Sequence, residues 1–364
     1  MRSLISALAM TTLVALGAAG EAFTLRTDTS KALVPLEEIV SGGPPPDGIP
    51  AIDRPAFVKP VEAAAWVAPK EPVLALDVKG DARAYPLQIL MWHEIVNDVV
   101  GGVPVTVTFC PLCNSGIVFQ RVVDGTTLDF GTSGKLYKSD LVMYDRQTHS
   151  LWAQMEGRAI VGSRAGTRLK LVPANTLSFE EWRAIHPSGK VLSRDTGHSR
   201  TYGRNPYASY DQPQLGPVLF QGRIDPRRPP KERVVGISLG EAARAYPWPV
   251  LVERRVVHDQ LSGQALVIFY QPGTLSALDD EDIKRSRAVG ATAAFSRSVE
   301  RRALTFEVTG DGFRDRETGS TWTLLGRAVK GPLAGRRLDP IPHVDAFWFA
   351  WAAFNPGTFV YEAR

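Results

Sequence analysis

The sequence predicts a β-rich α+β fold made of two tandem copies of a barrel- or sandwich-like unit, each with about two helices. Two observations lead to this prediction. Short β-branched and aromatic runs bounded by Gly, Asp-Gly or Ser-Gly recur along the chain, as is typical of strands. Long segments also occur twice in the same order. A chain of 364 residues has room for two domains of ordinary size.

The duplication begins where folded patterning begins. "EPVLALDVKGDARAYPLQIL" (71–90) and "ERVVGISLGEAARAYPWPVL" (232–251) share Ala-Arg-Ala-Tyr-Pro, so that Tyr85 aligns with Tyr246. Three further pairs of segments match: 95–109 with 256–270, 143–162 with 313–331, and 178–189 with 346–358. A unit of this size, about 120–130 residues, indicates two like domains side by side, because solenoids repeat shorter units at least three times.

These matches define five expected segments. They are a signal peptide (1–22), an irregular lead-in (23–70), a first unit (71–191), a linker or strap (192–231) and a second, degenerate unit (232–364). The strap is rich in Gly, Pro and Tyr, which favours loops.

The first 22 residues have the features of a secretory signal peptide. A positive start, Met1-Arg2-Ser3, precedes an uncharged apolar run and then small residues, with cleavage expected near Gly20 or Ala22. The apolar run is shorter than the roughly 20 residues that span a bilayer. We therefore expect a periplasmic or secreted protein with no membrane span in the mature chain, in a compartment where thiols tend to oxidise.

Composition excludes a nucleic-acid-binding role. Hydrophobic residues make up 44% and charged residues 22%, a globular balance without bulk disorder. The formal net charge is only +4, and the arginines are scattered without forming a dense stripe.

Two helices are predicted in the first unit. One covers 86–100, with Pro86 in its first turn and Gly101-Gly102 after its end. The other covers 178–186, where Ser178 and Glu181 have the spacing of a capping box. Between them, Asp124-Gly125 predicts a tight hairpin turn.

The duplication also separates scaffold from chemistry. Residues present in both copies, such as Arg83 and Asp145 with their partners Arg244 and Asp315, are expected to be structural, for example as buried Arg–Asp pairs. Residues present only in the first copy are candidates for a site. They are Cys110 and Cys113 (opposite 271–274), His93 (opposite Arg254), Met143 (opposite Phe313) and His149 (opposite Gly319).

The stretch "TFCPLCNSG" (108–116) holds both cysteines of the chain. A strand precedes it, and a turn with a second strand follows, which is typical of a metal-binding knuckle. A redox Cys-x-x-Cys motif is instead expected at the start of a helix, which lowers the pKa of the first thiol. One knuckle supplies two of the four ligands of a closed tetrahedral site.

Other first-copy residues are needed to complete such a site. We predict His93 as a further ligand, with Met143 and His149 as additional candidates and Asp98 and Asp145 as weaker ones. Thiolates with His or Met form a soft donor set, which in an exported protein favours copper, with zinc or iron as alternatives. The protein would then be a metal carrier, an electron-transfer module or an oxidoreductase, and its partner a small-molecule substrate or a metal-donor protein.

Two alternatives stay open. Cys110 and Cys113 could form a reversible dithiol with Cys110 as the attacking thiol, or a structural disulfide in a non-catalytic binding module. Whether the protein is an enzyme is left open; in an enzyme, the cleft between the two units would be the natural substrate site.

A family resemblance is carried by the "WHEIVND" helix and by three segments in order: "FCPLCNSGIVFQR", "FGTSGKLYKSDLVMYDRQTHSLWAQMEGRAIVG" and "HPSGKVLSRDTGHSRTYGRNPY". In these segments the chain resembles a bacterial domain family of unknown function that is found in exported proteins. The resemblance covers roughly residues 70–360. It implies that His93, Glu94, Asn97, Cys110 and Cys113 belong to one recurring constellation. Asn114 departs from the family, which often carries Gly there, and this alters the turn chemistry without removing a ligand.

Overall fold

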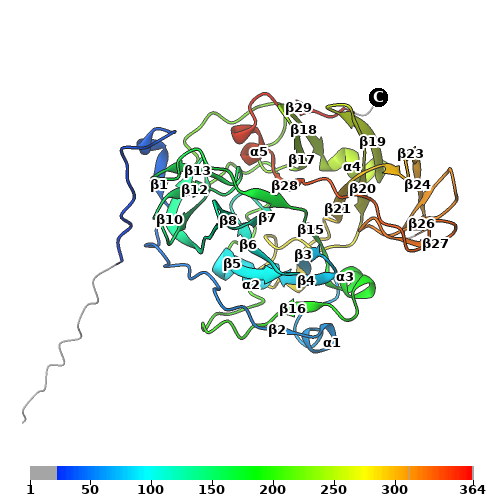
Figure 1. Ribbon diagram of the computed structural model, residues 1–364, viewed down its shortest axis with the longest axis horizontal. Coiled ribbons are helices and arrows are strands. Elements are labelled where there is room, and N and C mark those ends of the chain that lie inside the picture. The colour runs from blue at the N-terminus through cyan, green and yellow to red at the C-terminus, as the bar shows by residue number, and fades with distance from the viewer. Residues whose placement is uncertain (1–22, 311, 363–364) are drawn as a thin grey trace, which may run out of the picture.

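The computed structural model describes residues 23–310 and 312–362, and strands dominate it (Figure 1). The predicted signal peptide lies outside the described residues. The β-rich α+β class is confirmed, and no sheet of the described part closes into a barrel. The helices are α1 (Pro60–Ala63), α2 (Leu87–His93), α3 (Phe179–Ile185), α4 (Trp248–Arg254) and α5 (Trp348–Phe354), with 3₁₀ turns η1 (Leu36–Glu38) and η2 (Ile283–Arg285).

Three main sheets are built from the first copy and the lead-in. The first, in the order β15-β3-β4-β16-β2, contains Asn175–Ser178, Pro72–Val78, Asp81–Pro86, Lys190–Leu192 and Phe57–Val58. The second, β14-β7-β6-β5, contains Lys170–Val172, Ser115–Gln120, Val103–Cys110 and Ile95–Val100. The third, β1-β10-β11-β12-β13, contains Ile39–Ser41, Phe130–Tyr137, Asp140–Asp145, Leu151–Ala153 and Arg158–Val161.

The second copy repeats this arrangement. Sheet β28-β17-β18-β29 contains Val344–Phe347, Arg233–Leu239, Ala242–Pro247 and Phe359–Val360, and sheet β19-β20-β21 contains Val256–Leu261, Gln264–Gln271 and Ala291–Ser296. Sheet β24-β25-β26-β27 contains Phe306–Thr309, Gly312–Asp315, Thr321–Trp322 and Ala328–Lys330. Two short hairpins complete the strands: β8 (Val122–Val123) with β9 (Thr126–Thr127), and β22 (Ser298–Val299) with β23 (Arg302–Ala303).

Equivalent strands pair in equivalent registers. In the first hairpin of each copy, Leu74 is opposite Tyr85 and Val235 is opposite Tyr246. Each copy then adds one parallel strand beside that hairpin, β16 against β4 and β29 against β18. The two sheets β10–β13 and β24–β27 lie at opposite ends of the molecule (Figure 1).

The shared charged residues have the structural role expected of them. Arg83 Nη1 donates to Asp98 at 2.6 Å, and both side chains are nearly buried. Arg244 forms the same ion pair with Asp259 in the second copy. Asp145 and Asp315 accept the indole N–H of Trp152 and Trp322, at 2.9 and 2.8 Å. Asp98 and Asp145 are therefore already engaged in the scaffold.

The predicted helix over 86–100 is wrong in its second half. α2 ends at His93, because Glu94 adopts a left-handed conformation with φ 58° and ends the helix. Ile95–Val100 then forms strand β5, in keeping with its β-branched residues. Gly101 and Gly102 make the turn from β5 to β6, with positive φ at both.

Other local predictions are confirmed. Ser178 caps α3, its hydroxyl accepting from the Glu181 N–H while the Glu181 carboxylate accepts in return. Asp124 and Gly125, both with positive φ, form the turn between β8 and β9. Each copy contains two helices, α2 and α3 in the first and α4 and α5 in the second.

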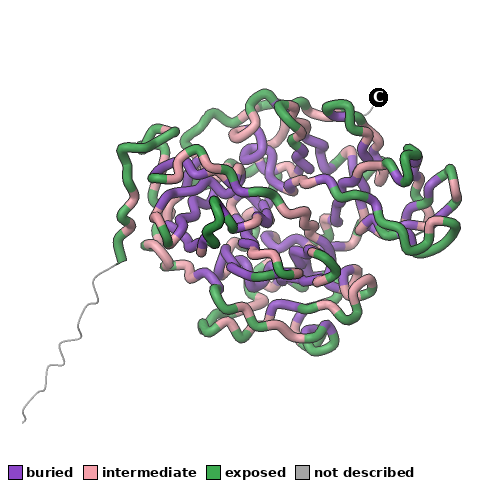
Figure 2. The backbone as a smooth tube through the Cα atoms, in the orientation of Figure 1, coloured by how far each residue is buried: buried purple, intermediate pink, exposed green. Residues whose placement is uncertain are grey.

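The cores of the two copies are joined. One buried cluster combines Cys110 and Met143 of the first copy with Phe347 and Trp351 of the second. A second cluster combines Val73 and Trp182 with residues of the other copy. Buried backbone accordingly fills the middle of the molecule, and exposed backbone lies at its rim (Figure 2). The domain boundaries drawn from the sequence stay predictions.

Candidate functional site

The two cysteines lie at the turn of the β6–β7 hairpin, which confirms the predicted strand–turn–strand. Cys110 is the last residue of β6 and pairs with Ser115, the first of β7. Asn114 closes the turn with φ 53°, a left-handed conformation that Asn adopts at small cost. The carbonyl of Cys113 accepts the Phe347 N–H at 2.9 Å, so a strand of the second copy holds this turn.

A third side chain joins the two thiols. The Sγ atoms of Cys110 and Cys113 and a carboxylate oxygen of Asp140 all lie within 4.8 Å of one another. All three residues are buried. Asp140 begins β11, which belongs to a different sheet from the cysteine hairpin. Two thiols and one carboxylate are a set that can ligate a metal ion.

The Asp140 carboxylate is only partly satisfied by hydrogen bonds. Its Oδ2 accepts the Met155 N–H at 2.8 Å, whereas Oδ1 has no partner at full hydrogen-bond geometry among the described residues. The thiols of Cys113 and Cys110 lie close enough to the carboxylate to donate weakly to it, which lowers its pKa against the effect of burial. Burial raises the pKa of Asp140 to about 7. An unpartnered buried oxygen is uncommon in folded proteins and calls for an explanation.

The cysteines are free thiols and are not bonded to one another in the structure. Burial raises the pKa of Cys110, and it raises the pKa of Cys113 well above its ordinary value. The attacking group in thiol–disulfide exchange is a thiolate, which is favoured by a lowered pKa. These surroundings therefore do not favour Cys110 as an attacking thiol.

Glu94 brings another carboxyl group to the same region. It is 8% exposed, and its carboxylate receives no hydrogen bond within the described part of the chain. Burial first, and the charge of Asp140 second, raise the pKa of Glu94 to about 8. Glu94 is also the left-handed residue, with φ 58°, that ends α2.

A cavity of about 780 Å³ opens beside Cys110 and Glu94. Its walls come from the lead-in, the cysteine turn, β10, β11 and the strap, including Tyr207 and Tyr210. Lys231 also lines it and is only 2% exposed; its ammonium group donates to the Tyr210 carbonyl at 2.8 Å. Burial lowers the pKa of Lys231 to about 8. The volume lies within the range of small-molecule sites.

Of the predicted ligands, the structure brings Cys110 and Cys113 together and places the others as follows. His93 Nδ1 bonds the Pro50 carbonyl at 2.7 Å and Nε2 bonds the Tyr202 hydroxyl at 2.6 Å, and burial lowers its pKa to about 4. Both ring nitrogens are thus engaged outside the thiol–carboxylate group.

Met143 and His149 lie further along the same part of the chain as Asp140. Met143 is fully buried in β11, in the hydrophobic cluster that includes both cysteines. His149 follows the far end of β11, whose two ends, Asp140 and Asp145, are about 17 Å apart at roughly 3.3 Å per residue. Its Nδ1 accepts the Arg26 N–H at 2.9 Å.

Sequence reasoning missed Asp140 and Lys231. Aligned on Asp145 and Asp315, Asp140 stands opposite Gly310, so the rule that first-copy residues mark the chemistry would have identified it. Lys231 aligns with Lys70, because Pro-Lys-Glu occurs at 69–71 and again at 230–232, so the rule that looks for residues of one copy only would have assigned it to the scaffold.

Among the described residues, no helix has the length and apolar character needed to cross a membrane. In comparisons with known proteins, the chain matched no curated protein and no solved structure. The family model "Protein of unknown function (DUF3179)" matches residues 46–358. Because this match covers most of the chain and agrees with the resemblance read from its motifs, the chain belongs to the DUF3179 family of proteins of unknown function.

Proposed function

We propose that this protein binds a metal ion through the thiolates of Cys110 and Cys113 and the carboxylate of Asp140. The observation that carries the proposal is the convergence of these three buried ligand atoms within 4.8 Å. Together they would carry up to three negative charges, and among the described residues no cationic side chain contacts the Asp140 oxygens. Burying like charges costs free energy unless a cation accompanies them, and a metal ion would supply that cation.

The donor set bears on which metal is bound. The expectation of copper assumed thiolates together with His or Met. A carboxylate oxygen is a harder donor, and zinc accepts sulfur and oxygen ligands together. We therefore propose zinc as the first candidate and retain copper as the competitor to be tested against it.

The site has two features of a metal centre that binds a small molecule: an open coordination position and an adjoining cavity. Three protein ligands leave a fourth position of a tetrahedral ion open, as in catalytic zinc sites. Cys110 and Glu94 both line the 780 Å³ cavity. The open position would face a space large enough for a substrate or a transferred ligand.

Metal analysis of purified protein tests the proposal. We expect one zinc ion per chain in the natural protein after reconstitution with equal zinc and copper(I), and a loss of at least tenfold in affinity in Cys110→Ser and Asp140→Asn. The matched control is Gln271→Ser, because Gln271 occupies the position of Cys110 in the second copy. Metal retained equally by all variants would overturn the proposal, and preferential copper loading would overturn the choice of zinc.

A further inference from the structure

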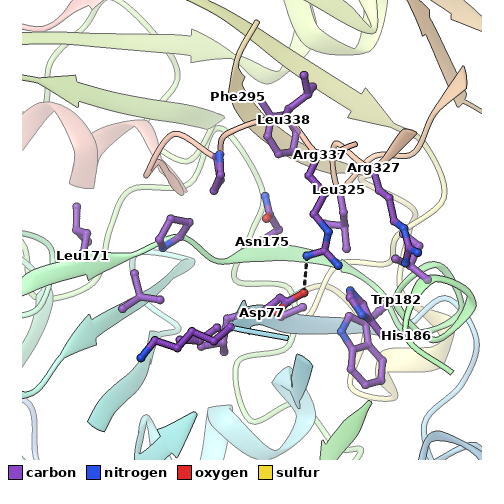
Figure 3. Close-up of a pocket in the computed structure, with 18 of the residues that line it drawn as sticks. Asp77, Leu171, Asn175, Trp182, His186, Phe295, Leu325, Arg327, Arg337 and Leu338 are labelled. Carbon is purple, nitrogen blue, oxygen red and sulfur yellow. Dashed lines mark hydrogen bonds and ion pairs between the residues drawn. The ribbon is translucent and has the colours of Figure 1, made fainter. Parts of the chain in front are cut away.

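A second cavity, of about 450 Å³, lies between the two copies (Figure 3). Asp77, Asn175 and Trp182 of the first copy line it, and Phe295 and Arg327 of the second copy face them. It shares no lining residue with the cavity beside Cys110. Its volume is typical of small-molecule sites, which occur preferentially at such junctions.

One part of this cavity is apolar. Leu171 lies at one end in Figure 3, and Phe295 and Leu338 form part of the wall from the second copy. Trp182 is 1% exposed, packed by the core beneath it, and contributes to the lining. Such walls remove the apolar part of a ligand from water.

The charges around the cavity are mostly positive. Four cations, Lys79, Lys170, Arg327 and Arg337, line it together with one carboxylate, Asp77. Arg337 Nη1 and Asp77 Oδ2 form an ion pair at 2.7 Å that joins the two copies across the cavity, drawn as the dashed line in Figure 3. The other three cations are exposed and form no ion pair with the described residues, so all three are available to an anion.

Arg327 lines both the 450 Å³ cavity and a neighbouring cleft. A polar cleft of about 670 Å³ adjoins the cavity and shares Lys79, His186 and Arg327 with it. Lys190 adds a further cation to that cleft, paired with Asp81. Figure 3 shows Arg327 and His186 at the end opposite Leu171. A ligand spanning this length would have its apolar part near Leu171 and its polar part near Arg327.

We propose that this cavity binds an amphipathic organic anion, a medium-length aliphatic carboxylate in chemical class. The acyl chain lies against Leu171, Phe295 and Leu338, and the carboxylate lies at Arg327 with Lys79 and His186 around it. A guanidinium presents paired N–H donors that match a carboxylate, and such charge-assisted bonds are the strong ones. The site is independent of the metal centre.

The duplication supplies a matched control for Arg327. In the aligned stretches "GRAIVG" and "GRAVKG", Arg158 occupies the position of Arg327. The backbones of both arginines form the same isolated antiparallel β-bridge in their own copy, Arg158 with Arg168 and Arg327 with Arg337. Arg158 does not line the cavity. Arg327→Gln and Arg158→Gln therefore make the same chemical change at equivalent places, only one of which is at the cavity.

Calorimetric titration of the full chain with octanoate, octanamide and inorganic phosphate tests the proposal. We expect saturable binding of one octanoate, at least tenfold weaker binding of octanamide and of phosphate, and a loss of at least tenfold for octanoate in Arg327→Gln but not in Arg158→Gln. Leu338→Gln should also weaken octanoate binding, while Cys110→Ser should not change it.

Several results would overturn the proposal. They are the absence of octanoate binding to the natural protein, phosphate binding as tight as octanoate binding, and equal losses in Arg327→Gln and Arg158→Gln. Circular dichroism and thermal melting of each variant establish that a loss of binding occurs in folded protein. Because Cys110→Ser is expected to bind octanoate normally, failure of the metal proposal leaves this test unaffected.

Discussion

Asp140 and Cys113 bring ligand atoms within 4.8 Å of one another although they belong to different sheets. Asp140 starts β11, and Cys113 lies in the turn that joins β6 to β7. Contact between the two sheets therefore builds the site, and neither sheet alone contains it. Its integrity should depend on the packing of these sheets as well as on the ligands themselves.

Removal of the metal should lower thermal stability. A ligand that binds only the folded state adds about 2.7 kcal/mol at a concentration 100 times its Kd. We expect a chelator to lower the melting temperature of the natural protein by several degrees and to leave that of Asp140→Asn unchanged. Differential scanning calorimetry with and without chelator measures this, and an equal shift in both proteins would contradict it.

The metal-free protein should lose stability as pH rises from about 5 to 8. The pKa of Glu94 is raised to about 8 in the folded protein, so the folded state holds a proton that the unfolded chain releases above its ordinary pKa near 4.5. Folding is thus favoured at the lower pH, and the contribution is lost as pH approaches 8. Asp140, with its pKa raised to about 7, acts in the same direction.

Glu94→Gln tests this pH dependence, because glutamine keeps the shape and cannot ionise. Urea unfolding of the metal-free proteins at intervals between pH 5 and 8 should give a flatter stability profile for Glu94→Gln than for the natural chain. The difference is expected to be on the order of 1–3 kcal/mol at pH 8, since one pKa unit corresponds to about 1.4 kcal/mol. Parallel profiles would show that Glu94 titrates normally in the fold.

His93→Gln should retain its metal. Both ring nitrogens of His93 are hydrogen-bonded, to Pro50 and to Tyr202, and the lost contacts belong to the strap and the lead-in. We expect unchanged metal content and a loss of about 1–3 kcal/mol in stability from the broken buried hydrogen bonds. Metal analysis beside urea unfolding separates the two effects, and a metal-free His93→Gln would restore His93 as a ligand.

Asp98→Ala should lower the free energy of unfolding more than Asp259→Ala does. Both variants break the same Arg–Asp pair, but the side chains of Arg83 and Asp98 are 10% and 6% exposed, against 25% and 15% for Arg244 and Asp259. Removing one partner of a buried pair costs about 3–5 kcal/mol, and solvent reduces that cost where it reaches the pair. Urea unfolding of the two variants measures the difference; equal losses would contradict the role of burial.

Asn114→Gly should be tolerated, whereas Asn114→Val should not. The φ of 53° at Asn114 suits Gly and Asn, and a β-branched residue is strained there. We expect a loss of about 1–2 kcal/mol and weaker metal binding in Asn114→Val, because the turn positions both cysteines. Thermal melting and metal analysis of the two variants side by side provide the measurement, and identical behaviour would argue against a strained turn.

Local sequence patterns predicted many of the strands, turns and caps of this protein, whereas features that depend on long-range contacts could not be predicted from them. The repeat, the Ser178 cap and the cysteine turn depend on neighbouring residues, and all were visible in the sequence. The end of α2 was missed, because the left-handed Glu94 is not a residue type that announces a helix stop. Asp140 was missed since only the packing of two sheets brings it to Cys113.

The hydrogen bond from the Phe347 N–H to the Cys113 carbonyl gives the second copy a structural role in the cysteine turn, which its own sequence does not indicate. That copy has no cysteine of its own, yet its strand β28 buttresses the turn that carries them. The copy that lacks the cysteines thus contributes a backbone hydrogen bond to the turn that holds them. We therefore expect that a chain cut after the strap would lose a support of the turn that carries both cysteines, and would not keep the candidate site intact.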